Sequence, residues 1–175
     1  HNHSPDGQSL YRMPLVQYKV IDGVLTVFGY NEAVPLLADK FTTVREIIIR
    51  DRQLTGFETS LRVKDEELIV AEELYSYCFD SCWLPVNQHN YIDYINNRLD
   101  LDKVLRNNML SNFKGLGVEA DKQIMVKGEY RERKIVVNDL EYFGILGKFV
   151  TNVRMPDYFG IGRMKAIGFG CIRRM

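Results

Sequence analysis

A glycine-rich segment near the end of the chain limits what the C-terminal part can fold into. Residues 157–170 read Asp-Tyr-Phe-Gly-Ile-Gly-Arg-Met-Lys-Ala-Ile-Gly-Phe-Gly, and an alternation of apolar and polar residues follows. Such a density of glycine disfavours a regular helix or strand across the whole segment. The glycines and the cations between them are Gly160, Gly162, Arg163, Lys165, Gly168 and Gly170.

This segment has two interpretations, which spacing alone leaves open. Glycine permits positive φ and close approach to another molecule, so the loop can turn its amides and its two cations toward phosphates. The alternative is structural, a tight hairpin or a bulged strand. The segment is not a dinucleotide-binding fingerprint, because a strand-like stretch follows it, and it lacks the Gly-Lys-Ser/Thr of a Walker loop.

The composition is that of a globular protein, with 46% hydrophobic and 26% charged residues. A length of 175 residues suits one domain of ordinary size or two small ones that share a core. No apolar run reaches the roughly 20 residues of a membrane helix, and no charged-then-apolar leader opens the sequence. We therefore expect a cytoplasmic protein without a membrane partner.

The cysteines favour free thiols. Cys78, Cys82 and Cys171 are an odd and sparse set, which argues against a disulfide framework. Cys78 and Cys82 with His89 would make a metal site only with a fourth ligand, and none stands at a familiar spacing. We expect no metal and no other cofactor.

The formal net charge is zero, but the charges are unevenly distributed. From Lys114 to the end there are 12 Lys and Arg against 7 Asp and Glu, whereas acidic residues cluster over 65–73. This distribution predicts one face that attracts anions, although solvated surfaces of the same composition are common.

The first 50 residues predict two strands, a helix and a strand. Apolar stretches at 15–21 and 24–28 flank an Asp-Gly pair, which is a hairpin signal. Residues 31–41 have apolar positions at helical spacing, with Asn31 as the candidate cap. The β-branched stretch 44–50 suits a buried strand.

The remaining residues predict a second set of elements in a similar order. Asn87 is a candidate cap for a helix that is followed by a further helical stretch over 101–113, and glycine at 115 and 117 ends it. Tyr75, Tyr77, Phe79 and Trp83 are expected in the core. The expected strands are 57–63, 68–79, 118–127, 135–137, 140–153 and 166–173.

The order of these elements fits the ferredoxin-like βαββαβ arrangement used twice, if the first copy lacks its opening strand and helix. The predicted fold class is therefore α+β with tandem ferredoxin-like domains. No internal sequence repeat is visible that would support the duplication.

Four stretches of the sequence carry a family resemblance. They are His-Asn-His at 1–3 with Tyr-Arg-Met-Pro-Leu-Val-Gln-Tyr-Lys at 11–19; Trp-Leu-Pro-Val-Asn-Gln at 83–88; Asn-Met-Leu-Ser-Asn-Phe-Lys-Gly-Leu-Gly at 108–117; and Met-Pro-Asp-Tyr-Phe-Gly-Ile-Gly at 155–162 with Gly-Phe-Gly at 168–170. In this order and spacing, they resemble the CRISPR-associated endoribonucleases that cut precursor CRISPR RNA within its repeats, part of the repeat-associated mysterious protein superfamily.

The resemblance spans essentially the whole chain and implies two domains. We place an N-terminal ferredoxin-like domain at residues 1–53 and a C-terminal one, with the glycine-rich loop at the RNA-binding face, at residues 54–175. In this family an opening strand and helix precede the histidine segment. The first domain is therefore expected to be incomplete in this chain.

The resemblance also implies metal-independent RNA cleavage. The neighbouring 2′-hydroxyl attacks the phosphate, which leaves a 2′,3′-cyclic phosphate and a 5′-hydroxyl. The step needs an acid, a base and a cation for the extra phosphorane charge, and histidine and lysine suit these roles. The family's catalytic histidine falls in the segment of His1 and His3, so either is a candidate acid or base, with Lys19 as charge stabiliser and Tyr11 as an orienting or proton-relay group.

The implied partner is CRISPR repeat RNA, single-stranded or in a stem-loop, held by Arg163, Lys165 and the amides around Gly160, Gly162, Gly168 and Gly170. A homodimer and an association with a CRISPR effector complex both stay open. The alternative function is a non-catalytic RNA-binding module of the same superfamily. A small-molecule or metal-sensing regulator of ferredoxin-like fold would need a pocket that the sequence does not indicate.

Overall fold

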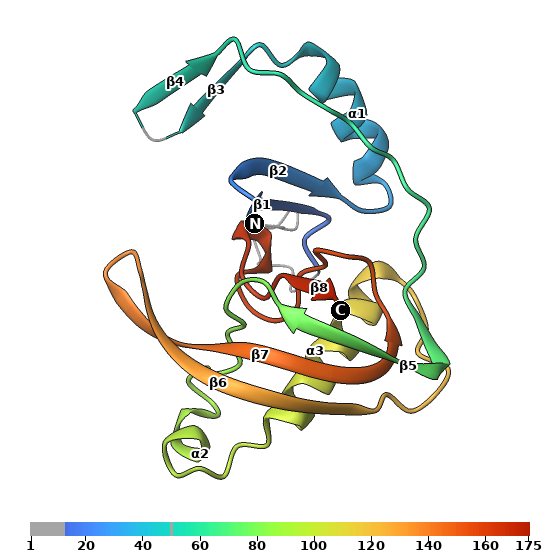
Figure 1. Ribbon diagram of the computed structural model, residues 1–175, viewed down its shortest axis with the longest axis vertical. Coiled ribbons are helices and arrows are strands. Elements are labelled where there is room, and N and C mark those ends of the chain that lie inside the picture. Colours follow the sequence, from blue (N-terminus) through green and yellow to red (C-terminus); the bar gives the residue numbers. More distant parts are fainter. Residues whose placement is uncertain (1–12, 50) are drawn as a thin grey trace, which may run out of the picture.

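The C-terminal part of the chain forms a four-stranded antiparallel sheet. The computed structural model describes residues 13–49 and 51–175. The strands lie in the order β6, β7, β5, β8, so that the central strand β5 pairs with two strands that are distant in sequence (Figure 1). The four strands are β5 (Ile69–Phe79), β6 (Val126–Val137), β7 (Leu140–Arg154) and β8 (Ile172–Arg174).

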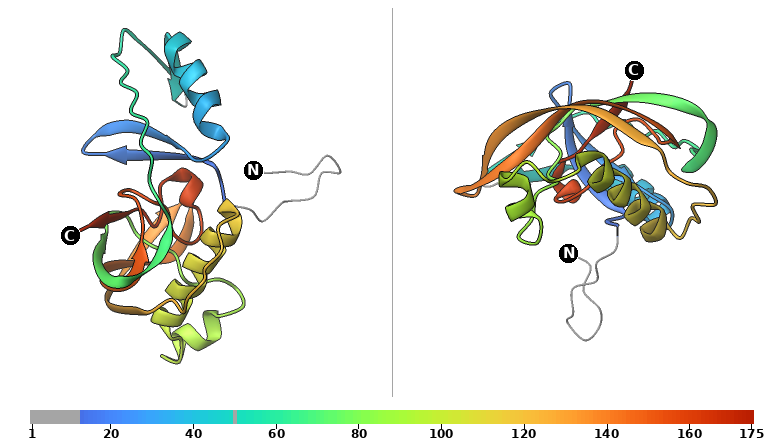
Figure 2. Two further views of the ribbon diagram at one scale, coloured as in Figure 1. Left: turned by 90° about the vertical axis from the view of Figure 1, so that its right-hand side faces the viewer. Right: turned by 90° about the horizontal axis from the view of Figure 1, so that it is seen from below.

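Helix α3 (Leu101–Leu116) covers one face of this sheet (Figure 2). Asp100 caps its start, because the side chain accepts a hydrogen bond from the Lys103 amide at 3.0 Å. Gly117 ends the helix in the left-handed conformation, at φ 69°. The predicted glycine stop is therefore confirmed at Gly117, whereas Gly115 lies within the helix. The buried residues of the helix are Leu105, Met109, Asn112 and Phe113.

The core lies between α3 and the sheet and is rich in aromatic side chains. Phe79 and Trp83 stack with ring centroids 5.4 Å apart, and Tyr77 stacks on Phe149 at 5.6 Å. Trp83 and Tyr77 are fully buried, and Tyr75 is 7% exposed. The predicted core role of these aromatic residues is confirmed. Such pairs add about 0.5–1.5 kcal/mol each beyond the burial of their area.

The connectivity of this half is ferredoxin-like. The chain passes from β5 through α3 to β6 and β7, and it returns to β8 at the edge beside β5. At the place of the second helix stands the glycine-rich segment, which holds a single 3-10 turn, η1 (Lys165–Ile167). The observed order is strand, helix, strand, strand, loop and strand, because the stretches expected as strands at 118–127 and 135–137 contribute to one continuous strand, β6.

The N-terminal part consists of two hairpins with a helix between them (Figure 1). The hairpins are separate two-stranded antiparallel sheets, β1 with β2 and β3 with β4. Asp22 and Gly23 turn the first hairpin at positive φ, as predicted. The elements are β1 (Val16–Ile21), β2 (Val24–Gly29), α1 (Ala33–Thr43), β3 (Glu46–Ile49) and β4 (Arg52–Thr55).

Strand β1 turns its polar residues inward. Gln17 is fully buried and Lys19 is 4% exposed, whereas Tyr18 and Val20 are 58% and 65% exposed. Alternation along a strand sends neighbouring side chains to opposite faces. The face with Gln17 and Lys19 packs against the glycine-rich segment near η1.

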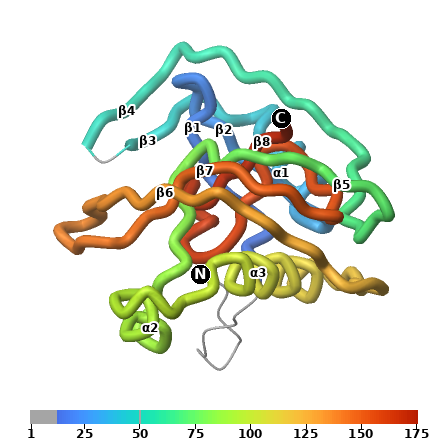
Figure 3. Tube along the Cα trace, turned by 60° about the horizontal axis from the view of Figure 1, so that its bottom comes forward, coloured from blue at the N-terminus to red at the C-terminus, as the bar shows by residue number. Residues whose placement is uncertain are grey.

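Residues 56–68 connect the two parts of the molecule along its outside (Figure 3). The strand predicted at 57–63 is wrong. Its side chains do alternate between apolar and polar, but the segment pairs with no strand of the described chain, and almost all of it is exposed. Without a partner for its backbone groups, an alternating segment stays a connection.

Three other sequence expectations need correction at their bounds. The strand expected at 44–50 is Glu46–Ile49, and it is largely exposed rather than buried, because it pairs only with β4. The strand expected at 118–127 begins only at Val126. The strand expected at 166–173 is shortened to Ile172–Arg174, since η1 and a glycine turn occupy its first half.

The helix expected to start at Asn87 begins later, as α2 (Tyr91–Ile95). Asn87 Oδ1 instead accepts hydrogen bonds from the amides of His89, at 2.8 Å, and Asn90, at 3.3 Å, and so closes a turn before the helix. No helix of the described chain is both long and apolar enough to cross a membrane.

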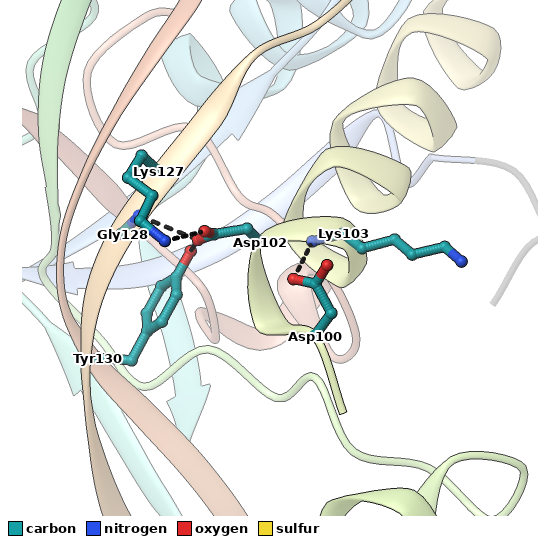
Figure 4. Close-up of polar contacts among 6 residues, drawn as sticks. All are labelled: Asp100, Asp102, Lys103, Lys127, Gly128 and Tyr130. Carbon is teal, nitrogen blue, oxygen red and sulfur yellow. Dashed lines mark hydrogen bonds and ion pairs between the residues drawn. The ribbon is translucent and has the colours of Figure 1, made fainter. Parts of the chain in front are cut away.

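Asp102 joins the first turn of α3 to strand β6 (Figure 4). Its Oδ1 accepts hydrogen bonds from the Tyr130 hydroxyl at 2.7 Å and from the Gly128 amide at 2.9 Å, and its Oδ2 pairs with Lys127 at 3.2 Å. Burial and this carboxylate both raise the pKa of Tyr130, so the phenol remains a donor. The helix is thereby fixed against the edge strand of the sheet.

Candidate functional site

The glycine-rich segment is closed on itself and tied to Ser81 and Cys82, which follow β5, by hydrogen bonds. The Ile161 amide donates to the Gly170 carbonyl at 2.9 Å, and the Gly170 amide donates to the Cys82 carbonyl at 2.9 Å. The Ser81 hydroxyl bonds both the Gly168 carbonyl, at 2.6 Å, and the Cys171 amide, at 2.9 Å. The two ends of the loop are therefore held together, and its shape is set before any ligand arrives.

Gly162 lies directly on the buried indole of Trp83. A Cβ at this position would stand 2.7 Å from Trp83 Nε1 and 2.9 Å from Asn108 Oδ1, and the residue has φ +86°. The indole donates to the same Asn108 oxygen at 2.9 Å. Glycine is thus required here by contact with the protein itself and by backbone conformation.

Arg163 follows on the exposed side of the loop. Its Nη1 donates to the Val86 carbonyl at 2.8 Å. A guanidinium has five N–H donors, and the other Arg163 donors have no acceptor among the described residues. The residue is therefore anchored to the Trp83–Val86 stretch while its remaining donors stay available to a ligand.

Gly160 lies between the N-terminal hairpin and helix α3. A Cβ there would stand 2.6 Å from Gln17 Oε1 and 2.8 Å from Lys165 Cβ. On the helix side, Asn112 Nδ2 donates to the Gly160 carbonyl at 2.9 Å. Gln17 Oε1 is buried and has no hydrogen-bond partner among the described residues. Polar side chains from three parts of the chain therefore meet at this glycine.

Lys165 is the half-buried cation of this cluster. Its Nζ donates to Oδ1 of Asn112, the same side chain that bonds Gly160. Burial lowers the pKa of Lys165 to about 8, because a charged ammonium loses hydration there. At neutral pH most of the population still carries the positive charge.

Lys19 is the second buried cation and comes from strand β1. Its Nζ donates to the Tyr158 carbonyl and lies 4.6 Å from the centre of the Phe28 ring. Burial lowers the pKa of Lys19 to about 8, and the sulfur of Cys171 nearby acts in the opposite direction. For the Cys171 thiol, whose charged form is the anion, burial acts in the other direction and raises the pKa to about 11. The thiol is therefore protonated at neutral pH.

The structure brings together five of the predicted site residues. A Cβ added to Gly168 would stand 3.6 Å from Lys19 Cα, so Lys19 lies against the same loop as Lys165 and Gly160. Gly162 and Arg163 face Trp83 and its neighbours instead. One of the five is Lys19, which packs on the loop from strand β1. The other four belong to the loop itself: Gly160, Lys165, Gly168 and Gly170.

The close approaches at Gly160 and Gly162 are to the protein's own side chains, which favours the structural interpretation of these two glycines. RNA contact by the loop stays a prediction. His1, His3 and Tyr11 lie outside the described residues. In the described part of the chain, no group of three or more His, Cys, Asp and Glu could hold a metal ion.

Sequence reasoning missed Gln17 and Asn112. A polar residue at a buried position of an amphipathic helix indicates a hydrogen-bonded site inside the protein, because a buried amide requires partners. Asn112 follows Leu105 and Met109 at helical spacing and meets that description. For Gln17 no such signal exists, because the exposed and buried faces of β1 are decided by its contact with the distant loop.

Both parts of the chain match descriptions of one protein family. Residues 1–67 match the Cas6b N-terminal domain, and residues 69–175 match the Cas6b C-terminal domain. The chain belongs to the Cas6b family. The two matches meet at residue 68, within the connecting segment, whereas the division predicted between residues 53 and 54 stays a prediction.

One relative and one solved structure are similar to most of this chain. An uncharacterized protein of Methanocaldococcus jannaschii is 31% identical over 140 residues, which covers 75% of this chain and 94% of that protein. A crystal structure of Cas6b superimposes with a TM-score of 0.90 at 25% identity, covering 99% of this chain and 83% of that one.

A second solved structure, of the CRISPR RNA processing endoribonuclease Cas6b, has a TM-score of 0.75 at 23% identity over 94% of this chain and 83% of that one. Proteins of this kind have tandem ferredoxin-like domains, so the predicted fold class is confirmed.

Proposed function

We propose that this chain binds precursor CRISPR RNA and cleaves it within the repeat, by a reaction that needs no metal ion. The observation that carries the proposal is the contact of strand β1 with the glycine-rich loop, which holds the Lys19 ammonium on the Tyr158 carbonyl and the Lys165 ammonium on the Asn112 side chain. Both keep a positive charge at neutral pH, Lys19 at a buried position and Lys165 at a half-buried one. Cations in such surroundings stabilise phosphate charge more strongly than cations in bulk water.

Membership of the Cas6b family supports the substrate class, since a Cas6b relative is described as a CRISPR RNA processing endoribonuclease. In the proposed reaction the 2′-oxygen attacks the neighbouring phosphorus as a base removes its proton. The bond from phosphorus to the 5′-oxygen then breaks, and an acid protonates that oxygen. The products are a 2′,3′-cyclic phosphate and a 5′-hydroxyl.

Lys19 is the proposed stabiliser of the phosphorane charge. Its burial on β1 beside the loop, with one N–H fixed on the Tyr158 carbonyl, suits an ammonium that keeps its place. Because a pKa of about 8 lies near the operating pH, the same group can also donate a proton.

The histidine roles are carried over from the sequence resemblance. His3 or His1 is the proposed acid or base, and Tyr11 the proposed orienting group. Arg163 and Lys165 are the proposed phosphate contacts, with the loop amides around Gly160, Gly162, Gly168 and Gly170 beside them.

The test is incubation of the chain in excess chelator with a labelled repeat RNA, next to a copy with 2′-deoxy at the cut. A single cut that persists in chelator and is abolished by the deoxy substitution is the expected result. His3→Ala should lower the single-turnover rate by about 100-fold or more while sparing RNA affinity. His89→Ala, in the turn before α2, is the matched control.

Three outcomes contradict the proposal. Cleavage that chelator abolishes would indicate a metal enzyme, and a cut in the deoxy copy would exclude 2′-hydroxyl attack. Binding without cleavage would select the non-catalytic RNA-binding module instead.

A further inference from the structure

Asn112 is an amide where a helix would ordinarily bury an apolar residue. It lies on the inner face of α3, 1% exposed, next to Phe113 and one turn after Met109. Burying an unpaired amide costs roughly 1–3 kcal/mol in proteins, so its partners must offset that cost. The identity of these partners is therefore informative.

Both ends of the Asn112 carboxamide are used by the glycine-rich loop. Nδ2 donates to the Gly160 carbonyl at 2.9 Å, and Oδ1 accepts from the Lys165 ammonium. Neither an aspartate nor an apolar residue can donate on one side and accept on the other. Asn112 thus connects the start of the loop with the cation at its centre.

We propose that Asn112 is a positioning residue for RNA recognition: it fixes the Lys165 ammonium on the inner side of the loop, so that Lys165 can bind an RNA phosphate. The inference rests on the proposed function. Lysine has three N–H donors on a flexible stem, and an acceptor that holds one of them lowers the entropy lost when the other two bind a ligand. No other described residue accepts from Lys165 Nζ.

Asn108 provides a matched comparison on the same helix. It lies one turn before Asn112, and its Oδ1 accepts from Trp83 Nε1 at 2.9 Å beneath Gly162. This contact supports the loop but reaches no cation. Loss of Asn108 should therefore destabilise the loop without acting through Lys165.

A double-mutant cycle separates positioning from support. The variants of the first cycle are Asn112→Leu, Lys165→Met and the two together. A second cycle uses Asn108→Leu in place of Asn112→Leu. The probe is a labelled repeat RNA with 2′-deoxy at the cut, so that binding is read without cleavage, and urea unfolding is measured in parallel. Asn112→Ala replaces Asn112→Leu in the cycle if the latter does not fold.

We expect Asn112→Leu and Lys165→Met each to weaken RNA binding by about tenfold, and the pair to be no weaker than Lys165→Met alone. In the double variant of Asn108→Leu and Lys165→Met, the two fold losses of RNA affinity should multiply. If the losses of Asn112 and Lys165 multiply as well, or if Asn112→Leu lowers stability but leaves RNA affinity unchanged, the inference is overturned while the proposed function stands. A wild-type chain that neither binds nor cuts repeat RNA overturns both.

Discussion

The ammonium of Lys19 donates a hydrogen bond to the carbonyl of Tyr158, across 139 residues of sequence. Lys19 belongs to the N-terminal hairpin, and Tyr158 lies near the start of the glycine-rich loop at a positive φ of 61°. A left-handed conformation at a residue other than glycine is held only by its surroundings. This contact therefore joins the two parts of the molecule at the candidate site and supports the shape of the loop.

The burial of Lys19 predicts a pH-dependent stability. Its pKa falls from 10.5 to about 8 on folding, because the buried ammonium loses hydration. Between these pH values the unfolded chain binds more protons than the folded protein, so this group makes stability rise with pH. From pH 7 to pH 9 the wild type should gain about 1 kcal/mol in free energy of unfolding relative to Lys19→Met.

Urea unfolding of both proteins at the two pH values measures this gain. Lys40→Met, at an exposed position of α1, controls for the loss of one lysine charge. A difference between wild type and Lys19→Met that stays constant across pH 7 to 9 would show that Lys19 keeps its proton as readily in the folded protein as in the unfolded chain.

The contact of Gly162 with Trp83 predicts a large effect of a single methyl group. In Gly162→Ala the new Cβ would lie less than 3.0 Å from Trp83 Nε1 and from Asn108 Oδ1. In addition, the backbone φ of +86° is strained for alanine. Trp83 is fully buried in the core and cannot move away without repacking. We expect destabilisation by about 2–4 kcal/mol, from backbone strain and overpacking together.

Gly23→Ala is the control for this variant, because Gly23 has nearly the same backbone conformation, φ +81°, with nothing within 4 Å of an added Cβ. It should cost only the strain, about 1 kcal/mol. Equal midpoints of thermal unfolding for the two variants would mean that the indole contact at Gly162 contributes nothing to the requirement for glycine.

Local patterns are enough to predict individual turns and helix ends, although they misplaced several strand bounds of the C-terminal sheet. The Asp22–Gly23 turn of the first hairpin and the glycine stop of α3 each act over a few residues, and the structure has both. The aromatic core follows from composition in the same way. These features depend on short-range chemistry, so a single sequence contains them.

The arrangement of the candidate site depends on contacts that no local pattern describes. Alternation in β1 predicts an inward face of Tyr18 and Val20, yet Gln17 and Lys19 are the buried residues. They are buried because the loop, some 140 residues later, supplies the Tyr158 carbonyl and packs on that face. The family resemblance therefore identified Lys19 as a candidate, but no local pattern explains its burial.

The two cations of the loop predict a measurable dependence of RNA binding on salt. Each phosphate contact to single-stranded nucleic acid changes the slope of log affinity against log salt by about 0.7. Lys165→Met and Arg163→Gln should each flatten the slope by about this amount. Because Arg163 is exposed and anchored to Val86, whereas Lys165 is half-buried and anchored to Asn112, the two effects should add.

Titration of an uncleavable repeat RNA between 50 and 300 mM salt, for example, gives these slopes, with the exposed Lys103→Met on α3 as the control for total charge. If the double variant keeps the wild-type slope, the loop cations make no phosphate contact, and the glycine-rich segment serves only to join β1 to the sheet. If only Lys165→Met changes the slope, the RNA backbone passes on the β1 side of the loop, next to Lys19, and the Arg163 side is free of RNA.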